Sequence, residues 1–315
     1  MKEIVISVND EGRRLDKYLQ TLLCNCGSSF IYKMLRKKNI VLNDVKASGK
    51  ELLTKGDSVK LYFSDETYEK FTKRSVSNVY SEAKMPPIIY EDDDIMIVDK
   101  PSGMLSQRST GTDISLNEIC ISYLYEKGTL TEGSQETFVP SICNRLDRNT
   151  SGLVTFAKTY RGARTLSQAF RDRTIHKYYE CIVVGTVDED LHLSGSLVKD
   201  EKANKVSVSS DMNGDHIETK IHPIKPGDKL SRLEILLITG KTHQIRAHLA
   251  SIGHPILGDY KYGNRSVNEQ YRRTFGIDSQ MLACCRLEFP VDFDLPGVAG
   301  KTIHIKAPSF FNEVL

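Results

Sequence analysis

The segment at residues 144–153, NRLDRNTSGL, holds the side chains of this chain that are best suited to chemistry. It places the carboxylate of Asp147 between the cations of Arg145 and Arg148, just ahead of the apolar run at 153–157. Positive neighbours favour the ionised form of a carboxylate. An ionised carboxylate acts as a nucleophile or stabilises developing positive charge, as in glycosyl transfer. The alternative is a structural aspartate that caps a turn, and the segment taken alone favours that alternative.

A second concentration of polar side chains lies at residues 239–263, TGKTHQIRAHLASIGHPILGDYKYG, where a predicted strand gives way to a predicted helix. Thr242, His243 and Gln244 stand at the start of that helix, and Arg246 follows. Free backbone N–H groups at a helix N-terminus favour anions. This corner suits a backbone phosphate or a catalytic carboxylate, so it strengthens the functional interpretation of Asp147.

Several familiar motifs are missing from the sequence. It contains no G-x-G-x-x-G and no G-x-S-x-G. Residues 240–242 (GKT) end like a phosphate-binding loop, but Ile235 stands where such a loop needs its first glycine. His243 and His248 are five positions apart, which does not match the H-E-x-x-H spacing of a zinc helix. We therefore expect no nucleotide cofactor, no other cofactor and no metal site.

Cysteine usage and hydropathy indicate the compartment. The seven cysteines show no framework spacing, which predicts free thiols in a reducing environment. The N-terminus MKEIVISVND has no apolar region typical of a signal peptide, and no apolar run reaches the length of a membrane span. We expect a cytoplasmic protein without a membrane partner, with a monomer as the default state.

Charge and composition divide the 315 residues into two expected domains and a linker. Residues 1–64 hold 12 Lys and Arg against 7 Asp and Glu, a local net charge of +5, which leaves −3 for the rest of a chain of net charge +2. Residues 65–85 are polar, lack periodicity and end at a Pro-Pro pair, so we interpret them as a linker. Residues 86–315 form the expected catalytic domain.

The elements expected in residues 12–62 are two short helices followed by a small β region, with cations on the second helix. This order, carried by GRRLDKYL and SxxIYKMLRKKNIVLND, resembles the small RNA-binding module shared by a ribosomal small-subunit protein and several RNA-modifying enzymes. The resemblance implies salt-sensitive phosphate contacts by Arg13, Arg14, Lys33, Arg36, Lys37 and Lys38. The charge run by itself favours only a solvated helix face.

From residue 87 onward the pattern predicts many strands and fewer helices. The expected strands are 88–90, 95–98, 153–157, 178–187, 231–240, 287–293 and 301–308. The expected helices are 115–125, 160–173 and 244–252, the last ended by Gly253. Strands and helices do not alternate strictly, which favours an α+β fold with a mixed, largely antiparallel sheet over a doubly wound fold.

Four motifs together carry a resemblance to a known family. They are YEDDDIMIVDKPSG (90–103), NRLDRNTSGL (144–153), IHKYYECIVVG (175–185) and GKTHQIRAHLASIGHPILGD (240–259). In this order they resemble a pseudouridine synthase of the RluA/RluC/RluD type over residues 86–290. The resemblance implies the pseudouridine synthase fold and the isomerisation of uridine to pseudouridine in structured RNA. It also implies a cofactor-free reaction on a base flipped out of the RNA.

The resemblance also implies a role for particular side chains. Asp147 is the catalytic aspartate that attacks the nucleoside. Tyr179 stacks on the target base and acts in the late proton-transfer step. Arg246 pairs with the aspartate and orders the site.

Further residues are expected to contact the RNA. Arg145 would occupy the gap left by the flipped nucleotide, and His243 and Gln244 would lie near the RNA-contacting loop. Lys241 stands where the family usually has Arg, which keeps the charge but loses the bidentate fork. Asn144 stands where the family most often has His, so the local hydrogen bonds at that position must differ.

The sequence leaves several alternatives open. The N-terminal module favours large-subunit ribosomal RNA as substrate, with transfer RNA as the alternative. A non-catalytic RNA-binding or ribosome-assembly protein is the main alternative to an enzyme. A glycosidase-like hydrolase would need a second carboxylate about 5–9.5 Å from the first, and no motif offers one. The sequence also leaves open whether Asp147 bonds covalently to the sugar or removes its 2′ proton to give a glycal.

Overall fold

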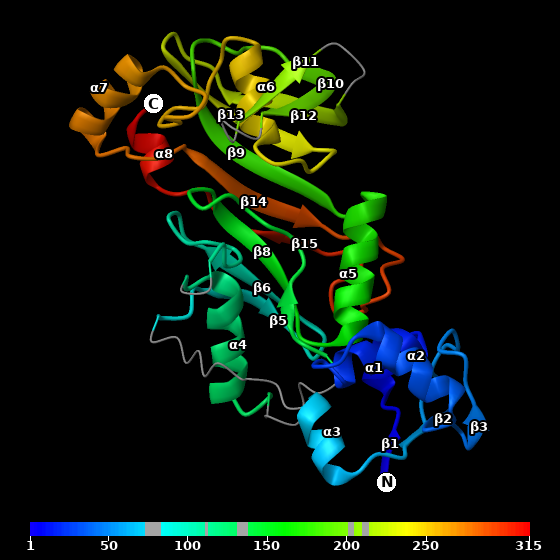
Figure 1. Ribbon diagram of the computed structural model, residues 1–315. Helices are drawn as coiled ribbons and strands as arrows, with labels where there is room; N and C mark the ends of the chain where they lie inside the picture. The colour runs from blue at the N-terminus through cyan, green and yellow to red at the C-terminus, as the bar shows by residue number, and fades with distance from the viewer. Residues whose placement is uncertain (73–82, 111–112, 131–137, 201–204, 210–213) are drawn as a thin grey trace.

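The structure, a computed structural model, describes residues 1–72, 83–110, 113–130, 138–200, 205–209 and 214–315 (Figure 1). Its described residues contain two main hydrophobic cores, one in the N-terminal unit and a larger one in the rest of the chain, and a small third cluster of Leu197, Ile217 and Ala247. None of the helices in these ranges is long and apolar enough to cross a membrane.

The N-terminal unit packs two helices on a small antiparallel sheet of order β1-β4-β2-β3. Its elements are β1 (Lys2–Val5), the short 3₁₀ helix η1 (Val8–Asp10), α1 (Leu15–Leu22), α2 (Ser28–Arg36), β2 (Ile40–Leu42), β3 (Val45–Lys46) and β4 (Ser58–Leu61). The apolar residues of α1 and α2 recur at helical spacing, and Leu15, Leu19 and Ile31 are fully buried against the sheet. Asn43 and Asp44 both adopt positive φ, as a two-residue hairpin turn of type I′ requires.

The predicted linker is wrong in its first part. Residues 65–72 form a helix, α3 (Asp65–Thr72), which joins the N-terminal unit. Tyr68 and Phe71 pack against that unit's core, and the rings of Phe30 and Phe71 lie 4.7 Å apart between centroids. These two apolar contacts give the segment a reason to fold that its polar composition conceals. The rest of the predicted linker, residues 73–82, lies outside the described part of the chain.

One large sheet organises the remaining chain, in the strand order β11-β10-β12-β13-β9-β14-β8-β6-β5 (Figure 1). Its strands are β5 (Ile88–Glu91), β6 (Ile95–Lys100), β7 (Ser141–Ile142), β8 (Ser151–Ala157), β9 (His176–Val184), β10 (Leu191–Asp200), β11 (Lys205–Ser209), β12 (Asp215–Lys225), β13 (Leu230–Leu237), β14 (Leu282–Glu288) and β15 (Thr302–His304). All strand pairs except β14–β8 are antiparallel, which confirms the predicted α+β fold with a mixed, largely antiparallel sheet.

The parallel pair β14–β8 joins the two halves of this sheet at Gly152. A Cβ atom at that position would lie 2.2 Å from the carbonyl oxygen of Cys284, and Gly152 has φ of +110°. Only glycine allows the two backbones to approach so closely. The glycine in NRLDRNTSGL therefore fixes where the loop that carries Asp147 meets the sheet.

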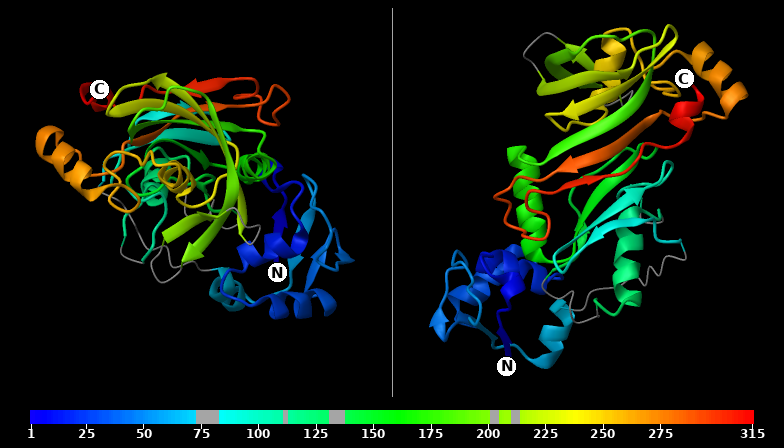
Figure 2. Two further views of the ribbon diagram at one scale, coloured as in Figure 1. Left: turned by 90° about the horizontal axis from the view of Figure 1, so that it is seen from above. Right: turned by 180° about the vertical axis from the view of Figure 1, so that it is seen from behind.

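Among the residues that the structure describes, five helices accompany the sheet: α4 (Leu116–Glu126), α5 (Tyr160–Asp172), α6 (Gln244–Ser251), α7 (Arg265–Phe275) and α8 (Phe310–Glu313). Three of them, α4, α5 and α6, were predicted, and Gly253 follows α6 with φ of +84° as expected of a residue that ends a helix. Figure 2 shows the sheet twisting along its length, with the N-terminal unit at one end of α5.

The predictions missed or displaced several elements. Strands β10, β11 and β12 and helix α7 were not expected. The predicted strand at 287–293 lies earlier, at Leu282–Glu288, because Pro290 ends it. This shift brings the buried pair Cys284 and Cys285 into the sheet, next to β9.

Candidate active site

The catalytic candidate Asp147 lies in the loop between β7 and β8, and buried groups hold this loop on both sides. Ser106 Oγ donates to the carbonyl of Leu146 at 2.8 Å and accepts from its N–H at 3.1 Å. Lys100 Nζ donates to the carbonyl of Arg148 at 3.0 Å. The residues directly before and after Asp147 are therefore fixed to the protein interior.

Lys100 is fully buried, although its side chain ends in a cation. It donates to three carbonyls, those of Pro101, Met104 and Arg148, at 3.0, 2.9 and 3.0 Å. Burial lowers the pKa of Lys100 to about 8, against the opposing charge of Asp147. Lys100 belongs to the motif YEDDDIMIVDKPSG, but its role could not be predicted, because burial of a lysine is not visible in sequence.

The carboxylate of Asp147 is paired with Arg246 of α6. Arg246 Nη1 donates to Asp147 Oδ2 at 2.9 Å, and Nε and Nη2 donate to both oxygens of Asp259 at 2.7 and 2.9 Å. The face of the guanidinium also lies 5.1 Å from the ring centroid of Tyr262. Arg246 is thus held in a single orientation by Asp259 and Tyr262, and its Nη1 is directed at the catalytic candidate.

Asp259 is the anchor of this arrangement, and the sequence analysis missed it. Its side chain is fully buried, and it also accepts from the backbone N–H groups of Lys261 and Tyr262. Burial raises the pKa of Asp259, but the hydrogen bonds and charge of Arg246 outweigh burial and hold it below its usual value. Asp259 lies in the segment GDYKYG of the sequence, but only the fold shows which groups its side chain contacts.

His243 is the third group near Asp147. Its Nε2 lies 3.7 Å from Asp147 Oδ2, and its Nδ1 lies 2.9 Å from the hydroxyl of Tyr262. That hydroxyl accepts from the N–H of Val206 at 3.0 Å, so its own proton is free to go to Nδ1. Burial lowers the pKa of His243, which leaves the ring neutral with Nε2–H toward the carboxylate. His243 has φ of 56°, an uncommon conformation for a non-glycine residue.

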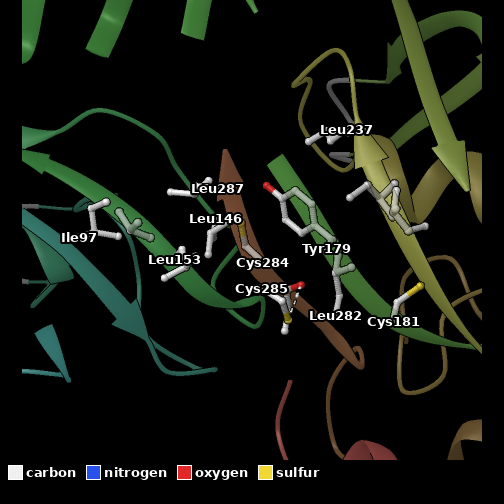
Figure 3. Packing of buried hydrophobic residues seen from close by; sticks show 14 of the residues in the cluster. Ile97, Leu146, Leu153, Tyr179, Cys181, Leu237, Leu282, Cys284, Cys285 and Leu287 are labelled. Atoms are coloured by element: carbon white, nitrogen blue, oxygen red, sulfur yellow. Dashed lines mark hydrogen bonds between the residues drawn. The ribbon is translucent and has the colours of Figure 1, made fainter. Parts of the chain in front are cut away.

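Tyr179 projects from β9 and is 5% exposed. It lies opposite Cys284 of β14 and Ile235 of β13 in the sheet, and Figure 3 shows its ring rising beside Cys284. Burial, with further contributions from Cys284 and Asp147, raises the pKa of Tyr179 well above its usual value. The hydroxyl is therefore protonated at neutral pH.

A cavity of about 860 Å³ brings the predicted residues together. Its lining includes all seven candidates from the catalytic domain, namely Asp147, Tyr179, Arg246, Arg145, Lys241, His243 and Gln244. Asp147 is the one carboxylate among the lining residues that the structure describes. Four further cations that the sequence analysis did not single out also line it: Arg108, Arg171, Arg173 and Lys177. The cavity thus presents one negative group to a ring of positive ones.

Gln244 does not meet its expected role as an RNA contact. It is 2% exposed, and its side chain bonds to Thr239, to Thr219 and to the carbonyl of Glu218. Its oxygen also accepts from the N–H of Lys241 at 3.1 Å. The glutamine instead holds the cavity wall in place.

Two substituted positions have clear structural partners. Asn144 accepts from the N–H and the hydroxyl of Thr155 at 2.7 and 2.9 Å, so it fixes the loop to β8. Lys241 is exposed and lies 2.7 Å from Asp215 Oδ1. The lysine therefore forms a surface ion pair and also lines the cavity.

The N-terminal candidates divide into two groups. Arg13 is 4% exposed, pairs with Asp10 at 2.9 Å and lies 4.5 Å from the ring centroid of Tyr160, so its burial contradicts a phosphate contact. Arg14 pairs with Asp16 at 2.8 Å and stays half exposed. The cations on or just after α2 are exposed, with no acidic side chain of the described residues at ion-pair distance: Lys33, Arg36, Lys37 and Lys38.

No three His, Cys, Asp or Glu side chains gather as metal ligands within the described ranges.

Comparison with known proteins identifies the class of site. A family model described as RNA pseudouridylate synthase matches residues 94–251. A ribosomal large subunit pseudouridine synthase C of Vibrio cholerae is 30% identical over 300 residues, which cover 94% of this chain and 90% of that protein. This chain belongs to the RNA pseudouridylate synthase family.

The chain is accordingly an RNA pseudouridine synthase, an isomerase, and its resemblance to the RluA/RluC type is confirmed. A second synthase C, from Rickettsia bellii, is 28% identical over 99% of this chain and 100% of its own length. Two solved human structures share the fold. RNA pseudouridylate synthase domain containing 1 matches 73% of this chain and 87% of its own, at a TM-score of 0.53 and 22% identity. RNA pseudouridylate synthase domain containing 4 matches 71% of this chain and 90% of its own, at a TM-score of 0.55 and 21% identity.

Proposed function

We propose that this pseudouridine synthase isomerises uridines of large-subunit ribosomal RNA, with Asp147 as the catalytic residue in the cavity between the β7–β8 loop and the start of α6. The observation that carries this proposal is the ion pair of Asp147 with Arg246, 2.9 Å long, beside Tyr179 in a cavity of about 860 Å³. The names of the Vibrio and Rickettsia relatives support ribosomal RNA as the substrate. The exposed cations of α2 support it too, because phosphate contacts dominate RNA affinity.

The reaction exchanges one glycosidic bond for another without a net change of atoms. The bond from C1′ of the ribose to N1 of the base breaks, the base turns, and a bond from C1′ to C5 forms. The proton on C5 is then lost and N1 gains one. Asp147 assists the first step either by bonding to C1′ or by taking the 2′ proton, and both routes begin from its carboxylate.

Arg246 and His243 fit this role because they orient the carboxylate without neutralising it. The Nε and Nη2 edge of the guanidinium is already bound to Asp259, so Arg246 offers Asp147 one hydrogen bond, to Oδ2, and leaves Oδ1 for the sugar. Neutral His243 directs Nε2–H toward the same oxygen. A held carboxylate loses little entropy when the substrate arrives.

Tyr179 acts as a stacking surface and as a proton relay. Its raised pKa keeps the hydroxyl protonated, so the hydroxyl can accept the C5 proton only while it passes its own proton on. Asp147, whose charge acts on Tyr179, is the acceptor that the cavity offers. Exposed Arg145 at the cavity wall is the wedge that fills the space of the flipped nucleotide.

Two other functions were considered for this site, a glycosidase-type hydrolase and a synthase that acts on transfer RNA. A hydrolase of the glycosidase type is disfavoured because the lining offers it no second carboxylate among the described residues. A synthase for transfer RNA would share the same chemistry and differ only in substrate.

Pseudouridine mapping of total RNA tests the proposal, by carbodiimide treatment and reverse-transcription stops in wild-type cells and in cells carrying only Asp147→Asn. Stops lost from large-subunit positions are expected. Stops lost only from transfer RNA would retain the chemistry and overturn the substrate. An unchanged stop pattern with the protein expressed would refute an enzymatic role in these RNAs.

A further inference from the structure

Helix α5 connects the cavity to the N-terminal unit. At its C-terminal end, Phe170, Arg171 and Arg173 line the cavity. At its N-terminal end, the ring of Tyr160 lies 4.5 Å from the guanidinium of Arg13. The helix has 13 residues, which makes it about 20 Å long. Figure 1 shows α5 beside the large sheet, with its lower end next to α1.

The N-terminal unit is docked on this helix through buried groups. Arg13 is held by Asp10 at 2.9 Å and by Thr21 at 2.8 Å, and its other face covers Tyr160. The backbone at Gly12 lies so close to Arg164 that a Cβ atom there would be 2.5 Å from the guanidinium nitrogen. The exposed cations of the N-terminal unit therefore have a defined position relative to the cavity.

The outer face of α5 is polar and carries exposed arginines, together with Asp172, whose carboxylate accepts a hydrogen bond from Gln168 Nε2 at 2.7 Å. Arg164, Gln168 and Arg171 are exposed and spaced by four and three residues, so they share one face of the helix. The opposite face buries Leu166 and Ala169 against the sheet. Arg171 Nη1 donates to Gln168 Oε1 at 3.1 Å, which ties the middle of this face to its cavity end.

Arg173 extends this face into the cavity. It ends the helix in the left-handed conformation, with φ of 60°, where glycine is the usual residue. An arginine at this position strains the backbone, but it places a cation at the cavity wall. Arg164, Arg171 and Arg173 have no acidic partner at ion-pair distance in the described part of the chain.

We propose that the outer face of α5, defined by Arg164, Gln168, Arg171 and Arg173, is an RNA-binding ridge that carries the substrate's phosphate backbone between the cavity and the N-terminal unit. This inference rests on the proposed function. Unpaired guanidinium groups in a line bind successive phosphates and need no base sequence. The substrate must then present a second RNA segment about 20 Å from the target uridine, one length of α5.

The sharpest test changes the charge at Gln168, which lies on the ridge but does not line the cavity. Gln168→Lys and Gln168→Glu are compared with wild type on two RNAs. One is a ribosomal fragment that includes the target uridine and its folded surroundings, and the other is a short stem-loop that holds the target uridine only. Gln270→Lys and Gln270→Glu, on the exposed surface of α7, are the matched controls.

On the long RNA, affinity is expected to follow the order Lys, Gln, Glu at position 168, with a change of several-fold at each step. The slope of log affinity against log salt should steepen by about 0.9 for the lysine if it gains one phosphate contact. The short stem-loop should bind all three alike, and the Gln270 variants should match wild type on both RNAs. Arg164→Gln should weaken long-RNA binding, and Arg164→Lys should restore most of it.

Two results would overturn the ridge. One is that wild type, Gln168→Lys and Gln168→Glu bind the long RNA with equal affinity and equal salt slope. The ridge would then not bind RNA, and an acidic protein would be the next partner to test. The other is an equal effect on both RNAs, which would place the influence of the charge in the cavity. Melting temperatures within about 2 °C of wild type establish that each variant is folded. Failure of the proposed function is separate, because the wild type would then bind RNA by the ridge yet form no pseudouridine.

Discussion

Arg246 Nη1 lies 2.9 Å from the carboxylate of Asp147, although 99 residues separate the two in the chain. The strand order of the large sheet makes this contact, because β8 follows the loop of Asp147 and β13 leads into α6. The remaining nitrogens of Arg246 are bound to Asp259, so the contact depends on a third residue that the reaction itself does not use.

Asp147→Asn should abolish turnover, because an amide is neither a nucleophile nor a base. RNA affinity should stay within about tenfold of wild type, equivalent to about 1.4 kcal/mol. Single-turnover assays and filter binding on the same RNA measure both effects. Asp188→Asn, an exposed aspartate outside the cavity, is the control and should match wild type. Equal loss of binding and turnover in the first variant would refute a purely chemical role.

Asp259→Asn should destabilise the protein by about 3–5 kcal/mol, because it leaves the buried guanidinium of Arg246 without its bidentate partner. Turnover should fall as well, since Arg246 would no longer be held toward Asp147. Urea unfolding provides the free energy. Asp215→Asn removes an exposed ion pair with Lys241 and should change the free energy of unfolding by less than about 1 kcal/mol. Similar values for the two variants would show that Asp259 is not an anchor.

Lys100 should make stability depend on pH above neutrality. Its pKa is about 8 in the folded protein and about 10.4 when exposed, so between these values the unfolded chain binds a proton that the folded chain lacks. The free energy of unfolding therefore gains about 1.5 kcal/mol from this group as pH rises from 8 to 9.5. Urea titrations of wild type and Lys100→Met across this range isolate the contribution. If the difference in the free energy of unfolding between the two proteins stayed constant across this pH range, Lys100 would not contribute in this way.

Tyr179→Phe should keep RNA affinity and base stacking, since the buried ring is retained. Turnover should fall by a factor of at least about 10² if the hydroxyl relays the C5 proton. RNA labelled with tritium at C5 measures that step through release of the label. Tyr178→Phe, on the neighbouring residue whose hydroxyl bonds to Glu288, is the control. Wild-type release from Tyr179→Phe would leave stacking as the sole role of the ring.

The exposed cations of α2 should reduce the salt dependence of RNA binding when they are removed. Lys33→Gln, Arg36→Gln and Lys37→Gln together should lower the slope of log affinity against log salt by up to about 2.7. Lys46→Gln, Lys50→Gln and Lys55→Gln remove the same charge from exposed positions outside α2 and should leave more of the slope intact. Equal slopes for the two triple variants would mean that α2 presents only a solvated face.

Much of the site could be predicted from the sequence because its motifs are local. NRLDRNTSGL and GKTHQIRAHLASIGHPILGD each span about twenty residues or fewer, and their loops and the start of α6 keep these side chains close together. Helices α1, α2 and α5 were predictable for a similar reason, since apolar residues at helical spacing form one buried face. Strands β10 to β12 were not, because polar residues occupy many of their positions and weaken the alternation.

Only the tertiary structure decided which polar side chains are buried, because burial depends on residues far away in the chain. It placed Arg13 against Tyr160 and Gln244 inside the cavity wall, so two expected RNA contacts became internal supports. It also gave Lys100 and Asp259 their roles, through hydrogen bonds to Arg148 and Arg246. The sequence by itself determined the family and the class of fold and predicted Asp147 as the catalytic residue, whereas the contacts that hold this side chain in place arose from packing between distant strands and helices.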